Sequence, residues 1–110
     1  MTVKVPVHAE LSIVDNSINV SGVLNFDTVP VLMKQAEQLF NNKDEISVDL
    51  ADVTDSNSAG LALLLEMIRV TKLQNKLISF KNLPEQIGVV ANAYGVDSEL
   101  GSFLASQSNS

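Results

Sequence analysis

Hydrophobic and polar residues alternate in four segments of the chain, and this pattern predicts four β-strands. Residues 7–14 and 18–24 alternate on either side of the turn signal Asp15–Asn16, so they are expected to form an antiparallel hairpin. Residues 46–51 and 76–82 alternate in the same way. The apolar positions expected to be buried are Leu11, Ile13, Val20, Val48, Leu50, Ile78 and Phe80.

Four further segments carry apolar residues at helical spacing. The expected helices are residues 29–42, 58–74, 84–95 and 99–105. Asp27–Thr28 is expected to cap the first helix, Gly95 to end the third, and Asp97–Ser98 to cap the fourth. The polar residues 52–57 are expected to form a loop before the long second helix.

The resulting order is β-β-α-β-α-β-α-α. Strands covered by helices on both faces are apolar on both faces, whereas these four strands alternate. The sequence therefore predicts an α/β protein: a single domain with a mixed four-stranded sheet and helices mainly on one face. This argues against a doubly wound nucleotide-binding fold. The domain is expected to span residues 1–110, with a core at about 7–105 and a frayed tail at 106–110.

Composition and charge then narrow the class of function. The net charge is −6, and the seven basic residues are scattered, which disfavours binding to nucleic acid or to an anionic membrane surface. The longest apolar run, residues 59–65, is far shorter than the ~20 residues of a membrane span. Pro6, His8 and Glu10 stand where a secretory signal would be apolar. We expect a cytosolic protein that is not inserted into a membrane.

Catalytic and metal-binding sites are not expected. The sequence contains no cysteine, which excludes thiolate metal sites and cysteine catalysis. His8 is the only histidine, and it would need a serine of segment 56–58 and an orienting acid to support hydrolysis, so a surface histidine is the preferred interpretation. Asp49, Asp52 and Asp55 lack the glycine and spacing of a calcium loop and are interpreted as solvated turn or cap residues. No glycine-rich phosphate loop occurs, and we expect no enzyme and no cofactor.

The start of the long helix is the most informative segment. Ser58 is expected to cap this helix by accepting a hydrogen bond from the backbone N–H of Gly60 or Leu61. One apolar face of the helix comprises Leu61, Leu64, Leu65 and Ile68. A second apolar stripe, nearly opposite, comprises Leu63, Val70 and Leu73. Either the flanking helices cover this stripe, or it is left for a partner.

The order of elements and the segment Asp55–Leu65 resemble the STAS domain, a family named for sulfate transporters and anti-sigma-factor antagonists. The closest likeness is to the B subunit of the bacterial Mla phospholipid-transport ABC system. It rests on the segments Asn57–Leu65 and Val90–Val96, followed by Leu100, and the resemblance covers roughly residues 7–100.

This resemblance implies a function and a site. The chain would be a non-enzymatic accessory subunit that binds the ATPase of an Mla-type transporter and serves outer-membrane lipid asymmetry. It would be cytoplasmic and peripheral to the inner membrane through that complex. The implied partner contacts are Asp55, Ser56, Asn57, Ser58 and Leu61. A homodimer is compatible with the sequence but is not predicted.

The same resemblance leaves an alternative function open. Ser58 matches the serine or threonine that antagonists use as phosphoacceptor and that the Mla branch places at its ATPase contact. The alternative is therefore an anti-sigma-factor antagonist that is regulated by phosphorylation at Ser58. Asn57 stands where the family usually has aspartate, which removes a carboxylate beside this hydroxyl.

Overall fold

The structure is a computed structural model that describes residues 9–105. Its elements are β1 (Ala9–Val14), β2 (Ser17–Leu24), α1 (Val29–Phe40), β3 (Glu45–Ser56), α2 (Ser58–Leu73), β4 (Leu77–Lys81), α3 (Glu85–Ala93) and α4 (Asp97–Gly101). The predicted order of strands and helices is confirmed.

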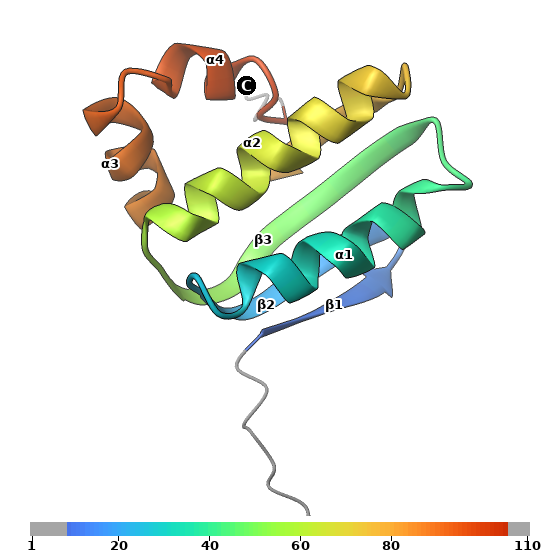
Figure 1. Cartoon of the computed structure of the whole chain (residues 1–110), viewed down its shortest axis with the longest axis horizontal. Helices are drawn as coiled ribbons and strands as arrows, with labels where there is room; N and C mark the ends of the chain where they lie inside the picture. Colours follow the sequence, from blue (N-terminus) through green and yellow to red (C-terminus); the bar gives the residue numbers. More distant parts are fainter. Residues whose placement is uncertain (1–8, 106–110) are drawn as a thin grey trace, which may run out of the picture.

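The four strands form one mixed sheet in the order β1-β2-β3-β4. β1 and β2 are antiparallel, whereas β2, β3 and β4 run parallel to one another. The hairpin turn uses Asp15 and Asn16, both of which have positive φ (51° and 68°), as a tight two-residue turn requires. Figure 1 shows α1 and α2 on the same side of this sheet. The expected α/β fold with helices mainly on one face is confirmed.

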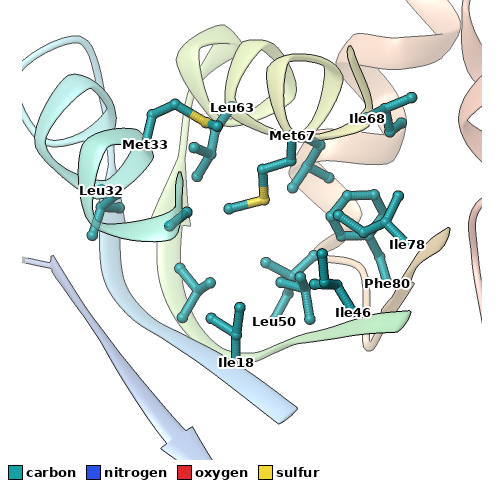
Figure 2. Close-up of a cluster of buried hydrophobic side chains, with 14 of the residues drawn as sticks. Ile18, Leu32, Met33, Ile46, Leu50, Leu63, Met67, Ile68, Ile78 and Phe80 are labelled. Carbon is teal, nitrogen blue, oxygen red and sulfur yellow. The ribbon is translucent and has the colours of Figure 1, made fainter. Parts of the chain in front are cut away.

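The core lies between the sheet and these two helices. Ile18, Ile46, Leu50 and Phe80 of the strands face Leu32 and Met33 of α1 and Leu63 and Met67 of α2 (Figure 2). α2 buries most of both apolar stripes, because the sheet and α3 cover one side and α1 packs against the other. Of the second stripe, Leu63 and Val70 are buried, whereas Leu73 at the end of the helix is 71% exposed.

Ile13 was expected in the core, but its side chain is 47% exposed. It pairs with buried Ile18 and has the predicted orientation, yet it lies on the outermost strand next to the hairpin turn. Leu11, two residues earlier on the same face, is half-buried and packs against the core. The alternation therefore predicted the correct face, but burial on an edge strand also depends on how far the overlying helix reaches.

The segment predicted as a polar loop, residues 52–57, is mostly strand, because β3 continues to Ser56. It stays paired with β2 after two shifts of register, and the last pair is Leu24↔Ser56. Gly22, with φ of 93°, lies beside the second shift. Backbone pairing with β2 mainly defines this part of β3, since only Val53 packs against the core and the other side chains are polar and mostly exposed.

Three predicted helix ends also differ from the structure. Thr28 makes no cap bond to α1; its hydroxyl instead donates to the Val23 carbonyl oxygen at 2.8 Å. α4 begins at Asp97 and ends at Gly101, earlier than expected. The following residues leave the helix because they pair with β4, through a bridge between Phe80 and Leu104. The C-cap of α3 is Tyr94 rather than the expected Gly95, and Gly95 follows it with φ of 75°, the left-handed conformation that often ends a helix.

Candidate protein-interaction site

The junction between β3 and α2 lies at the edge of the sheet where its parallel strands end. β2 and β3 end together, and the Asn57 N–H donates to the Leu24 carbonyl oxygen at 3.2 Å. β4 ends much earlier, since its pairing with β3 stops at Asp49↔Lys81. At ~3.3 Å per residue, the rest of β3 extends roughly 20 Å beyond β4. The junction therefore stands clear of β4, at the edge where sheets with parallel strands typically bind ligands.

Asn57, rather than Ser58, is the N-cap of α2. Its backbone is extended, with φ of −108° and ψ of −162°, and its Oδ1 accepts the Ala59 N–H at 2.8 Å. Its carbonyl oxygen accepts the Gly60 N–H at 2.9 Å. Ser58 is already the first helical residue, which corrects the expected cap. Asn57 thus supplies the cap with its amide oxygen.

The two residues should differ in their contribution to stability. Asn57→Ala removes the cap and is expected to lower the free energy of unfolding by ~0.5–2 kcal/mol. Ser58→Ala removes no cap bond and introduces a better helix former, so its effect should be within about 0.5 kcal/mol. Urea unfolding of both variants measures the difference. An equal loss in the two variants would contradict the assignment of Asn57 as the cap.

The structure exposes only part of the predicted contact set. Asp55 and Asn57 are exposed and Ser58 is half-exposed, so these three side chains share one accessible surface. Ser56 is 9% exposed, and its hydroxyl donates to the Asn57 carbonyl oxygen at 3.0 Å. Leu61 is 3% exposed and belongs to the core. Ser56 at the end of β3 and Leu61 in α2 therefore point inward and are not accessible on the folded surface.

α3 supports the junction from the side that β4 leaves open. The Gln86 amide donates to Asp55 Oδ1 at 2.9 Å, which links the start of α3 to the end of β3. Ile87 is fully buried beside Gly60 of α2. A side chain at residue 60 would meet neighbours at once: its Cβ would overlap Ser56 Oγ and lie 3.3 Å from Leu24 Cδ1. The glycine therefore allows α2 to start in close contact with the strands.

Gly60→Ala is accordingly expected to destabilise the fold by ~1–3 kcal/mol, the usual cost of overpacking. Ser56 would have to rotate away from its hydrogen bond before the methyl group could fit. Gly101→Ala is the matched control, because no atom lies within 4 Å of a Cβ there. Thermal melting should show a lower Tm for the first variant and an unchanged or higher Tm for the second. An unchanged Tm for Gly60→Ala would contradict the close approach.

The three acids interpreted as solvated turn or cap residues lie within β3, and each accepts a hydrogen bond from a different side-chain amide. Asp49 pairs with Asn82 at 2.9 Å, Asp52 with Asn19 at 3.0 Å, and Asp55 with Gln86. The Asn82 bond lowers the pKa of Asp49 below its usual value, although partial burial opposes it. Within the described residues, no group of three acids or histidines could hold a metal ion.

Acidic side chains dominate the charge of this edge. Among the described residues, the segments around the junction, residues 23–33, 51–62 and 83–93, contain no lysine or arginine. Asp27, Asp55 and Glu85 are all exposed there. Within residues 9–105, these three acids therefore give the edge a negative potential, and a positively charged surface would complement it.

Phe26 also lies near this edge, although no sequence pattern pointed to it. This side chain is 68% exposed in the turn between β2 and α1, two residues after Leu24. The available signal was an aromatic residue between Asn25 and Asp27, in a turn where polar residues are usual. His8, in contrast, lies outside the described residues.

Comparison with known proteins agrees with this architecture. A family model described as "Mlab, STAS domain" matches residues 8–104. Among solved structures, the chain is similar to the anti-sigma factor antagonist SpoIIAA in its unphosphorylated form. The TM-score is 0.65 and the sequence identity 16%, over 90% of this chain and 89% of that one. At this identity the likeness supports the fold alone.

A search of curated proteins found no match. Between residues 9 and 105, no helix is long and apolar enough to cross a membrane.

Proposed function

The chain belongs to the STAS domain family, and from this premise we propose that it is a non-enzymatic accessory subunit of an Mla-type phospholipid transporter. It would bind the cytosolic ATPase of that transporter and stabilise or regulate its assembly. It would thus act in the cytoplasm, peripheral to the inner membrane through the complex. The observation that carries this proposal is the match of the MlaB family model to nearly all of the chain.

The geometry of the junction supports a role in protein binding. Asp55, Asn57 and Ser58 are accessible on a rigid support, since β3, α2 and α3 hold them by backbone and side-chain hydrogen bonds. Residues presented from the ends of regular elements often carry function. Ala59 and Gly60 are buried and serve the packing of α2 against the strands, so the accessible contact consists of Asp55, Asn57 and Ser58.

A second candidate function is anti-sigma-factor antagonism, with Ser58 as the phosphoacceptor. The half-exposed position of Ser58 favours it, because a kinase needs access to the hydroxyl. Phosphorylation would add ~1.5–2 negative charges at the start of α2 and would alter any interface formed there. Asn57 argues against this function, because its amide stands where the family usually has a carboxylate.

A binding experiment with two partners tests the proposal. The purified chain should bind the ATPase encoded beside a transporter permease in the same genome, and should not bind an anti-sigma kinase. The chain alone should hydrolyse no ATP. If a kinase binds the chain and phosphorylates Ser58, and the ATPase does not bind, anti-sigma-factor antagonism replaces the proposed function.

A further inference from the structure

We propose that Phe26 is the apolar anchor of the partner-binding surface, and that the partner's docking face presents an apolar pocket rimmed by lysine and arginine side chains. The inference rests on the proposed function, since it concerns the same partner and the same edge of the sheet. Nothing in the sequence pattern assigned a role to this residue.

Phe26 lies next to the exposed residues of the junction. Its strand, β2, pairs with the end of β3, and the backbone bond from Asn57 N–H to Leu24 O fixes the two segments together. The side chain is 68% exposed, although it is one of the largest apolar groups in the chain. Phe26 is therefore not part of the core, and it lies two residues beyond the strand end that is bonded to Asn57.

The turn that carries Phe26 is held rigidly. Asn25 Oδ1 accepts the N–H groups of Asp27 at 2.8 Å and Thr28 at 2.9 Å. The Thr28 hydroxyl accepts the Asn25 N–H at 2.9 Å and donates to the Val23 carbonyl oxygen. Both neighbours of Phe26 are thus fixed to the strand end. An aromatic side chain on such a support loses little conformational entropy on binding, which makes it an efficient anchor.

The surrounding charges indicate the chemistry of the partner. Asp27 is adjacent to Phe26, and Asp55 and Glu85 lie along the same edge, where the described segments contain no lysine or arginine. A central aromatic residue with a charged rim is the usual composition of a binding hot spot. Because the rim here is acidic, the complementary face is basic around an apolar pocket.

Leu73 provides a matched control for this argument. It is 71% exposed, as accessible as Phe26, but lies at the opposite end of α2. It lines a groove with Lys34 and Glu37 of α1, so charges of both signs accompany it. It therefore shares the apolar exposure of Phe26 without the acidic surroundings.

The test is the affinity of the purified ATPase for the parent chain, Phe26→Ala, Leu73→Ala and Ser58→Arg, with thermal melting of each. Phe26→Ala is expected to weaken binding by about 30-fold or more, the scale of a hot-spot residue. Leu73→Ala should bind within about twofold of the parent. Raised ionic strength should slow association, because the attraction to a basic face is then screened. Phe26→Leu keeps an apolar group and serves as a second variant if the alanine variant melts early.

The outcomes separate the two proposals. If Ser58→Arg loses binding but Phe26→Ala binds as tightly as the parent, Phe26 is not the anchor and the proposed function stands. An association rate that does not depend on salt would contradict the proposal that lysine and arginine surround the partner's pocket. If the parent itself does not bind the ATPase, the proposed function fails, and the assignment of this partner to Phe26 fails with it.

Discussion

Ser58→Arg is expected to abolish measurable binding to the transporter ATPase while the domain remains folded. Ser58 is half-exposed and makes no cap bond, so the fold can accept a long side chain there. At an interface, the same side chain introduces volume and an unpaired charge, at a cost of about 2–5 kcal/mol in affinity. A basic partner face would add repulsion. Titration calorimetry for affinity and thermal melting for folding measure the two effects separately.

Ser98→Arg is the control for this prediction. Ser98 is exposed in the first turn of α4, so it offers the same substitution in a similar setting away from the junction. The Ser98→Arg variant should bind the ATPase as tightly as the parent chain does. If Ser58→Arg is folded and also binds as tightly as the parent, the interface is not at the β3–α2 junction. The groove at Leu73 would then be the next surface to test, since Leu63 and Val70 of the same stripe are buried.

Leu50→Ala is expected to produce the largest loss of stability, about 2–5 kcal/mol, because it leaves a cavity in the core. Leu50 is 1% exposed, in the central strand β3, and faces the core beneath α1 and α2 (Figure 2). Leu77→Ala makes the same chemical change at a residue that is 67% exposed on β4. Its effect should be within about 0.5 kcal/mol. Guanidinium unfolding of both variants gives the comparison, and a loss below ~1 kcal/mol for Leu50→Ala would contradict the packing described.

The fold was largely predictable because alternation records which side of a strand faces the core. Val48, Leu50 and Phe80 follow this rule and are buried as expected. Ile13 lies on the face that the alternation predicts, but its side chain is exposed. The sequence pattern does not show how far α1 extends over the edge strand. The second half of β3 was missed for a related reason. Its pairing with β2 uses backbone groups, which leave no periodic trace in polar residues such as Asp52 and Asp55.

The candidate site was predictable in place but not in detail. The small residues after β3 located the junction, yet the sequence could not decide which of Asn57 and Ser58 caps the helix. That choice depends on one backbone conformation, the extended φ and ψ of Asn57. Likewise, Leu61 is inaccessible because of its direction on the helix. Phe26 was missed because a turn between two elements has no period, and its proximity to Asn57 depends on long-range strand pairing.

The pairing of residues 103–105 with β4 has a consequence for synthesis of the chain. Phe80 donates its N–H to the Phe103 carbonyl oxygen at 2.8 Å and accepts the Ala105 N–H at 2.6 Å, so this last segment covers an otherwise open edge of the sheet. On the ribosome, β4 emerges well before these residues do. During that interval the nascent sheet presents unpaired N–H and C=O groups, which are able to recruit a strand from another chain. A nascent chain released before residue 103 would lack this cover and would be prone to aggregate through β4.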